Sequence, residues 1–109
     1  MKIEAPRPGQ RVRGSRTGRP VMAALDLLGR RGSLRVLWEL RDGAPRTFRE
    51  LSAAAELPPA TLNTRLRELR DAGIVDADGG YKLSKLGLQL PAALAPLVEW
   101  AGSWAKARR

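Results

Sequence analysis

Two adjacent prolines, Pro58 and Pro59, interrupt a stretch of helical sequence in the middle of the chain. Proline lacks an N–H group and its ring clashes with the preceding turn, so one helix cannot run through this pair. Before the pair, Thr47 and Glu50 have the spacing of a capping box, in which each side chain satisfies a backbone N–H group at a helix start. Pro59 suits the first turn of a new helix. The sequence therefore predicts a short helix after Thr47, a tight turn, and a helix from Pro59 to a stop at Gly73.

The helix expected after Pro59 has one apolar and one polar face. On a helical wheel, Leu62, Leu66 and Leu69 fall within about 60° of one another and should face the core. The residues opposite them are Ala60, Thr64, Arg67 and Asp71, with Asn63 to one side. Glu68 lies beside arginines of the same helix, which predicts a solvated and partly paired carboxylate.

The polar face of this helix has the chemistry of a DNA-reading surface. Short side chains allow a helix to sit deep in a major groove, Asn63 can pair bidentately with adenine, and Arg67 can reach guanine or phosphate. The candidate base-reading residues are Pro59, Ala60, Thr61, Asn63, Thr64 and Arg67. A surface helix without a ligand would look similar, so the neighbouring elements have to distinguish the two interpretations.

Two further helices are expected before the capping box. The first begins at Pro20 and stops at Gly29, and Ser33 is a suitable N-cap for the second, which Gly43 ends before Pro45. Their apolar residues are Val21, Ala24, Leu25 and Leu28 in the first helix, and Leu34, Leu37, Trp38 and Leu40 in the second.

After Gly73 the apolar spacing changes from that of a helix to that of short strands. Residues 78–80, Asp-Gly-Gly, form a turn sequence suited to a tight hairpin. Helical spacing returns from Leu86 and is interrupted by Pro91 and Pro96. The expected fold is mainly α-helical with a small β-hairpin, and it forms one domain over residues 20–109.

The charge of the chain is strongly positive and uneven. Twenty Lys and Arg stand against eleven Asp and Glu, a net charge of +9, which favours a polyanionic partner. Residues 1–19 hold six of these cations and one acidic residue, and they are rich in Pro, Gly and Ser. Because they offer almost nothing to bury, we expect them to form a flexible basic arm.

Cysteine and histidine are both absent. Disulfides, zinc–thiolate sites and thiol catalysis are therefore excluded, and the commonest metal ligand and general base is missing. No Gly-rich phosphate loop follows a strand, so we expect no enzyme, no cofactor and no metal site. No apolar run approaches the roughly 20 residues that span a bilayer, which predicts a cytoplasmic, nucleoid-associated protein without a membrane partner.

Two sets of residues after Arg19 follow the pattern of a known family. The first set is Pro20, Leu25, Asp26, Gly29, Leu37, Glu39, Leu40, Phe48, Glu50 and Leu51. The second is Pro59, Leu62, Arg65, Leu66, Glu68, Leu69 and Gly73, followed by YKLSKLG at residues 81–87. Together they resemble the HxlR-type winged-helix transcriptional regulators, and MarR-type and ArsR-type regulators carry similar stretches in the second half. The resemblance implies a winged helix-turn-helix domain that binds double-stranded DNA.

The resemblance also implies a homodimer built from the first and last helices. The residues expected in that interface are Val21, Leu25, Leu28, Leu94, Leu97, Val98, Trp100, Ala101 and Trp104. The two tryptophans of the last helix make a large aromatic area that has to be covered. The alternative is that this helix forms a lid on the core of its own chain.

The sequence departs from the family pattern at three places. Arg19 stands where relatives have a sensor-type cysteine before Pro20, so thiol sensing is excluded. Gly32 replaces the tryptophan of the family, which should loosen the junction between the first two helices. The hairpin is shortened and carries Asp76 and Asp78 where relatives often have arginine, so phosphate should repel its tip.

Cations around the reading helix are candidates for phosphate contacts. Arg46 and Arg49 flank the helix start that Thr47 caps, where anions are favoured, although a solvated surface is the alternative. Lys82 and Lys85 lie at the base of the hairpin and can touch the DNA backbone. The basic arm is a further candidate, since N-terminal arms enter the minor groove in homeodomains.

The function that this pattern favours is sequence-specific regulation of transcription. Two copies of the helix over residues 59–72 would enter successive major grooves of an inverted repeat. The alternative is a winged-helix module for protein–protein interaction or for nonspecific DNA architecture, because fold alone does not fix function. The short acidic hairpin is the feature that favours this alternative.

Overall fold

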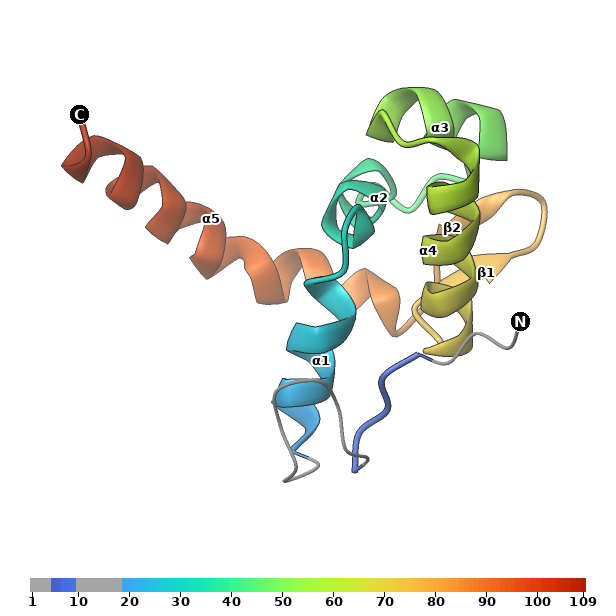
Figure 1. Cartoon of the computed structure of the whole chain (residues 1–109), viewed down its shortest axis with the longest axis horizontal. Coiled ribbons are helices and arrows are strands. Elements are labelled where there is room, and N and C mark those ends of the chain that lie inside the picture. Colours follow the sequence, from blue (N-terminus) through green and yellow to red (C-terminus); the bar gives the residue numbers. More distant parts are fainter. Residues whose placement is uncertain (1–4, 10–18) are drawn as a thin grey trace.

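The computed structural model describes residues 5–9 and 19–109, and within them the expected fold class is confirmed (Figure 1). Its elements are α1 (Pro20–Leu28), α2 (Ser33–Glu39), α3 (Phe48–Ala55), α4 (Pro59–Asp71), β1 (Val75–Ala77), β2 (Tyr81–Leu83), a short 3₁₀ helix η1 (Gly87–Gln89) and α5 (Leu90–Ala107). The part of the chain that is described contains no helix long and apolar enough to cross a membrane.

A leucine core holds α2, α3 and α4 together. Leu62, Leu66 and Leu69 of α4 are at most 1% exposed, as the helical wheel predicts, and they meet Leu40 and Leu51 in the same cluster. Burying a leucine side chain contributes about 1.5–3 kcal/mol, so these five residues fix how the three helices pack. The outward face of α4 follows from this packing.

The turn between α3 and α4 is built as the prolines and the capping box predict. The Thr47 N–H donates to the Glu50 carboxylate at 2.8 Å, and the Glu50 N–H donates to the Thr47 hydroxyl at 3.1 Å. At the other end of α3, Glu56 adopts a left-handed conformation, and the Ser52 hydroxyl donates to the Leu57 carbonyl at 2.9 Å. Each end of α3 is therefore held by local side-chain chemistry.

The hairpin lies beside the start of α3. Strands β1 and β2 are antiparallel, with Val75 opposite Leu83 and Ala77 opposite Tyr81, and residues 78–80 form the expected turn. Tyr81 exchanges two backbone hydrogen bonds of 2.8 Å with Arg46, in the loop before α3. This bridge fixes the hairpin next to the helix-turn-helix, in the position of a wing.

The start and end of α2 differ from the prediction. Gly32 occupies the N-cap position with φ of 90°, while Ser33 is the first helical residue and is buried, so Ser33 does not act as the N-cap. The helix ends at Glu39, and a turn continues to Gly43. Gly32 lies against the loop between α3 and α4, because a Cβ at position 32 would lie 2.8 Å from a methyl group of Leu57.

The core takes only part of the apolar residues of α1 and α2. It receives Ala23 and Leu27 from α1 and Val36, Leu37 and Leu40 from α2. Val21, Ala24, Leu25, Leu34 and Trp38 are exposed, and among them Val21 and Leu25 are residues for which a dimer interface is expected. Each of these helices has two overlapping apolar stripes, and helical spacing alone does not show which of them is buried by tertiary packing.

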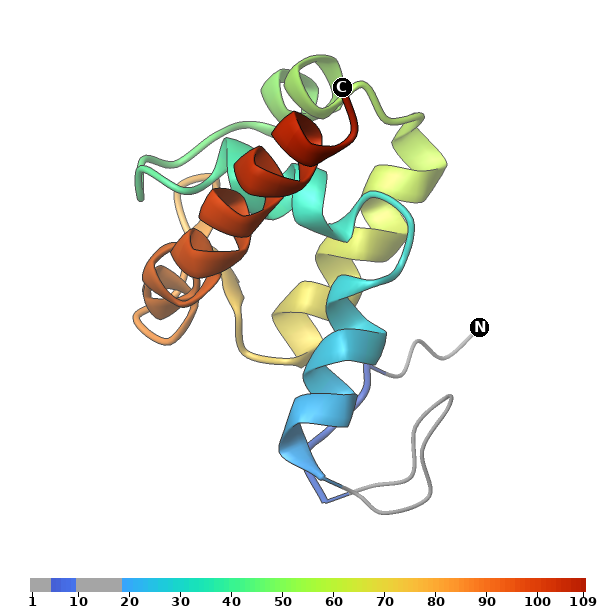
Figure 2. The same ribbon diagram turned by 90° about the vertical axis from the view of Figure 1, so that its left-hand side faces the viewer.

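Helix α5 projects from the body of the molecule (Figure 1). Seen from the side to which it points, its C-terminal half lies in front of the remaining helices (Figure 2). It continues through Pro96 without interruption, while Pro91 lies in its first turn, where proline is tolerated. Although Leu90 packs against the core, α5 contributes no fully buried residue. It is therefore not a lid on the core of its own chain.

The described part of the N-terminal arm is attached to the domain. Ala5 is 4% exposed within the core cluster, and its N–H donates to the Asp71 carboxylate at 3.2 Å. The Arg7 guanidinium donates to the same carboxylate at 2.8 Å. Residues 5–9 thus differ from the expected free arm, while residues 1–4 and 10–18 of that arm lie outside the described residues.

Candidate nucleic-acid interface

The outward face of α4 combines small, amide and cationic side chains. Ala60, Asn63, Arg67 and Arg70 are exposed, and they recur at the three- and four-residue spacing of one helical stripe. Pro59 is also exposed and begins the helix. An amide followed by two guanidinium groups on one stripe can donate hydrogen bonds to base edges and to phosphates.

The two threonines of this helix are less available than the sequence suggests. Thr61 and Thr64 are half-buried, and the Thr64 hydroxyl donates to the Ala60 carbonyl at 3.1 Å. Asp71, expected on the same polar face, is engaged by Ala5 and Arg7. Asn63 and Arg67 are therefore the exposed polar side chains among the candidate base-reading residues.

Arg70 belongs to the exposed stripe and was not among the residues singled out from the sequence. The wheel measured from the three leucines places it about 80° from Leu62, near the edge of the apolar face. It is nevertheless exposed, because the opposite edge of α4 is buried: Glu68 is 4% exposed and pairs with Arg30 and Arg65. The expectation of a solvated Glu68 is thus wrong, and the burial of Glu68 turns the open face toward Asn63 and Arg70.

An open groove of about 450 Å³ lies between α4 and β1. Arg67 and Arg70 line one side, and Asp71 and Asp76 contribute acidic groups to the same groove. The arginines favour a phosphate there and the carboxylates oppose it, so the groove is of mixed charge. Arg67 and Arg70 thus belong both to this groove and to the exposed stripe of α4.

The cations around the start of α3 are partly engaged within the chain. The Arg46 guanidinium is half-buried and lies 3.3 Å from the Asp42 carboxylate, while Arg49 is exposed. Thr47 is occupied by the capping box. The pKa of Glu50 is lowered, first because the Thr47 backbone N–H donates to its carboxylate, then through the Thr47 side chain and the positive charge of Arg46. Arg49 is the cation of this group with the most open side chain.

The hairpin carries Asp78 in its turn, Asp76 and Lys82 opposite each other on the two strands, and Lys85 after β2. Asp76 and Asp78 are exposed, Lys82 is half-buried directly opposite Asp76 in the register, and Lys85 is exposed after β2. Directly opposed side chains share one face of an antiparallel pair, so Asp76 offsets the charge of Lys82. Lys85 is the more available of the two lysines for a DNA backbone.

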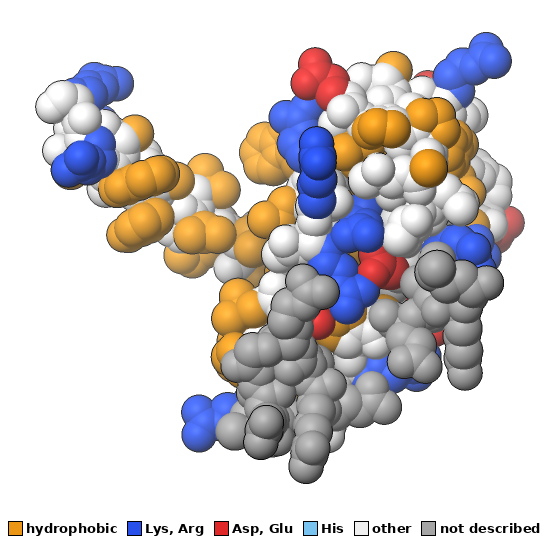
Figure 3. Space-filling model, in the orientation of Figure 1, with side chains coloured by type: hydrophobic (Ala, Val, Ile, Leu, Met, Phe, Trp, Pro, Cys, Tyr) orange, Lys and Arg blue, Asp and Glu red, His pale blue; other side chains and the backbone are white. Residues whose placement is uncertain are grey.

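Apolar side chains expected at a dimer interface are on the surface of this chain. More than half of the side-chain area is exposed at Val21, Leu25, Leu97, Val98, Trp100 and Trp104. Ala101 is also exposed, and Leu28 and Leu94 are half-buried. The space-filling view shows hydrophobic side chains along the projecting α5 (Figure 3). Contiguous apolar surface of this kind marks an interaction site.

A groove of about 210 Å³ separates α5 from α2. Its walls are almost entirely apolar and include Leu34, Trp38, Leu94 and Val98. The one charged side chain in the lining is that of Arg41, whose guanidinium lies 4.1 Å from the centre of the Trp38 ring. The groove is continuous with the exposed side chains of α5 through Leu97 and Val98.

Over the described ranges, no group of three or more acidic side chains is arranged to hold a metal ion.

The chain is similar to known helix-turn-helix proteins in sequence. The model of a family described as "Helix-turn-helix domain" matches residues 33–77. The HTH-type transcriptional regulators Mb3122 of Mycobacterium bovis and Rv3095 of Mycobacterium tuberculosis are each 33% identical to this chain over 95 residues. These alignments cover 80% of this chain, which spans only 60% of the length of either relative.

Two solved structures share the arrangement of helices and hairpin. The quinone-bound structure of YodB from B. subtilis superposes with a TM-score of 0.72 at 28% identity, over 76% of this chain and 96% of YodB. The MarR family protein Rv2887 of Mycobacterium tuberculosis superposes with a TM-score of 0.63 at 31% identity, over 82% of this chain and 70% of Rv2887. With this fold, this wing and these relatives, the chain belongs to the winged helix-turn-helix transcriptional regulators, the class that includes Rv2887.

Proposed function

We propose that this protein regulates transcription by binding double-stranded DNA with α4 in the major groove. The observation that carries the proposal is the exposed stripe of Ala60, Asn63, Arg67 and Arg70 on a helix that the leucine core and the capped α3 hold rigidly. A small residue at the entry permits close approach, Asn63 pairs with adenine, and the arginines reach guanine or phosphate. Exposed Arg49 and Lys85 add contacts to the DNA backbone.

The functional unit in this proposal is a homodimer. Exposed Val21 and Leu25 on α1, together with the stacked tryptophans of α5, supply the self-complementary apolar surface that a two-fold interface needs. Two copies of α4 then read half-sites about one helical turn apart in an inverted repeat. Such a regulator acts on the nucleoid.

We assign the chain to the HxlR-type regulators within this class. The support is the segment around Pro20, Leu25 and Asp26 and the YKLSKLG segment at residues 81–87. The absence of cysteine removes thiol sensing from this protein. Any regulation of DNA binding therefore depends on other groups.

Because the hairpin carries acidic residues, we propose that the wing makes only a small part of the DNA contact. Exposed Asp76 and Asp78 would be repelled by phosphate, so the basic residues of the arm are proposed to take over part of that contact. Replacing Arg11, Arg13 and Arg16 together by glutamine tests this role and preserves the attachment of Ala5 to Asp71. An unchanged salt dependence of DNA affinity would remove the arm from the interface.

Selection from random double-stranded oligonucleotides, combined with sedimentation analysis of the bound species, tests the whole proposal. We expect an inverted-repeat motif bound by a dimer. If about six cations engage per dimer, log affinity falls with log salt at a slope of roughly −5. A selection that returns no motif would instead favour a nonspecific architectural role or a protein-binding role, which the acidic hairpin also fits.

A further inference from the structure

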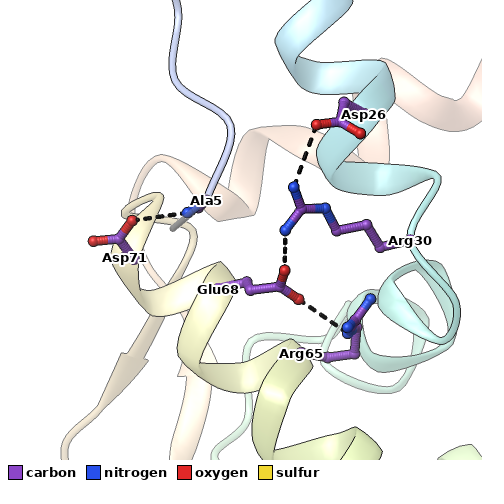
Figure 4. Close-up of polar contacts among 6 residues, drawn as sticks. All are labelled: Ala5, Asp26, Arg30, Arg65, Glu68 and Asp71. Atoms are coloured by element: carbon purple, nitrogen blue, oxygen red, sulfur yellow. Dashed lines mark hydrogen bonds and ion pairs between the residues drawn. The ribbon is translucent and has the colours of Figure 1, made fainter. Parts of the chain in front are cut away.

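An ion-pair network joins α1 to the buried side of α4 (Figure 4). Arg30, in the turn after α1, lies 3.3 Å from the Asp26 carboxylate on α1 and donates from its other terminal nitrogen to the Glu68 carboxylate on α4. The second carboxylate oxygen of Glu68 lies 3.0 Å from Nε of Arg65. Two acids and two arginines therefore alternate in an electrically neutral chain that connects residues 38 positions apart.

Stability alone does not account for this network. The Glu68 side chain is 6% exposed, and a carboxylate buried to that extent has to be paired. The cost of removing buried charges from water largely cancels their attraction, so apolar side chains of equal size would hold the helices together as well. Ion pairs add geometric specificity, because charge-assisted hydrogen bonds fix the relative position of the two groups that they join.

The network lies between the two surfaces that the proposed function requires. On α1, Val21 and Leu25 are exposed for the partner protomer, while on α4 Asn63 and Arg70 are exposed for DNA. The burial of Glu68 sets the rotation of α4 about its own axis, since it closes the helix edge opposite Arg70. A change at this ion pair would rotate or shift the reading stripe relative to the dimer contact.

We infer that Arg30 and Glu68 are positioning residues that fix α4 relative to α1 and thereby set the spacing between the two DNA half-sites. The inference rests on the proposed function, in which α1 contributes to the dimer. Neither side chain reads a base in this arrangement, because Glu68 faces inward and Arg30 lies beside α1.

Two variants separate positioning from folding. Arg30→Met removes the link between α1 and α4 and leaves Glu68 paired with Arg65. Glu68→Gln keeps the side-chain volume and removes the charge. Arg35→Met is the matched control, because it deletes the same kind of charge from an exposed pair with Glu56 on α3's C-terminal side. Each variant is first checked for helical content and for dimer mass.

The measurement is affinity for a panel of operators built from the selected half-site, with the half-site separation varied one base pair at a time. A second panel keeps the separation and changes single bases within one half-site. We expect the preference of Arg30→Met and Glu68→Gln for the best spacing to fall by roughly 2- to 30-fold relative to wild type and to the control. Base preference within the half-site should stay unchanged. A general loss of folding would change base preference as well.

If Arg30→Met forms a folded dimer and keeps the spacing preference of wild type, the inference is wrong. If Glu68→Gln does not fold, Arg30→Met combined with Asp26→Asn still decides the question, because Glu68 keeps Arg65 and no buried carboxylate is left without a partner. Failure of the proposed function is distinguishable, because the wild-type protein itself would then select no inverted repeat.

Discussion

The indole rings of Trp100 and Trp104 stack on α5 with their centroids 5.7 Å apart and their planes 9° from parallel. Both side chains are nonetheless more than half exposed, at 58% and 57%. Ordered aromatic pairs bury large areas when a partner covers them, and they are enriched among residues that dominate binding energy. A second copy of the chain is the proposed cover.

Trp104→Glu is therefore expected to dissociate the dimer. Loss of a central aromatic contact costs at least about 2 kcal/mol, which raises the dimer dissociation constant by about 30-fold or more. Sedimentation equilibrium measures this directly, and operator affinity should fall in parallel. Ser103→Glu is the control, since it adds the same charge at a neighbouring position of α5. A Trp104→Glu protein that remains dimeric would remove α5 from the interface.

Asn63→Ala is expected to relax sequence preference without weakening nonspecific binding. A bidentate amide–adenine pair discriminates by about 1–3 kcal/mol, whereas random DNA does not use it. Competition binding with operator and random duplexes distinguishes the two terms. Thr64→Ala should have the smaller effect, because the Thr64 hydroxyl already donates to the Ala60 carbonyl. Equal losses on both duplexes would assign Asn63 a general contact instead of base reading.

Arg70→Ala is expected to make DNA binding less salt-dependent. A dimer loses two cations, so the slope of log affinity against log salt should become shallower by about 2 if both touch phosphate. Titrations at several salt concentrations measure the slope on operator and on random DNA. Arg108→Ala, at the far end of α5, removes the same charge away from α4. Equal slopes for wild type and Arg70→Ala would leave Arg70 outside the interface.

The helix-turn-helix could be predicted from the sequence because its determinants are local. Thr47 and Glu50 lie three residues apart, Pro59 acts on its own helix, and the apolar face of α4 repeats within a few turns. Each of these signals depends on the chemistry of neighbouring residues, so no knowledge of tertiary contacts was needed. The same holds for the glycine-rich turn at residues 78–80.

Contacts between distant residues could not be predicted in this way. Glu68 appears solvated beside its helical neighbours, but it is buried and pairs with Arg30, 38 positions away, in addition to its helical neighbour Arg65. Ala5 lies in the core because Asp71, 66 positions away, accepts its N–H. Periodicity within one segment does not reveal such partners. For the same reason, the helical wheel does not show that Asp71 is engaged by the N-terminal segment or that Arg70 is exposed.

Glu50→Gln is expected to change how folding stability depends on acid pH. The lowered pKa of Glu50 means that its carboxylate stabilises the fold above the unfolded-state pKa, which is about 4.3. This contribution is lost as pH falls through the folded-state value. Glutamine also completes a capping box but does not titrate. The stability difference between wild type and variant, measured by urea unfolding, should therefore shrink as pH falls from about 5 through the lowered folded-state pKa. A constant difference would contradict this assignment.

Gly32→Ala is expected to destabilise the fold. Gly32 has φ of 90°, and an added Cβ would lie 2.8 Å and 3.0 Å from the two methyl groups of Leu57. A side chain in this left-handed region costs about 1–3 kcal/mol, before any movement of Leu57 is counted. Urea unfolding at one fixed protein concentration measures the change, because dimer stability depends on concentration.

Gly102→Ala provides the matched control for Gly32→Ala. Gly102 lies within α5, and a Cβ there would have no neighbour within 4 Å. Alanine in a helix is favoured over glycine by about 0.5–1 kcal/mol, so this variant should be neutral or more stable. Opposite signs for the two substitutions are the expected outcome. A neutral Gly32→Ala would mean that the α1–α2 junction is loose, as the missing tryptophan of the family suggests, and that Leu57 moves away without cost.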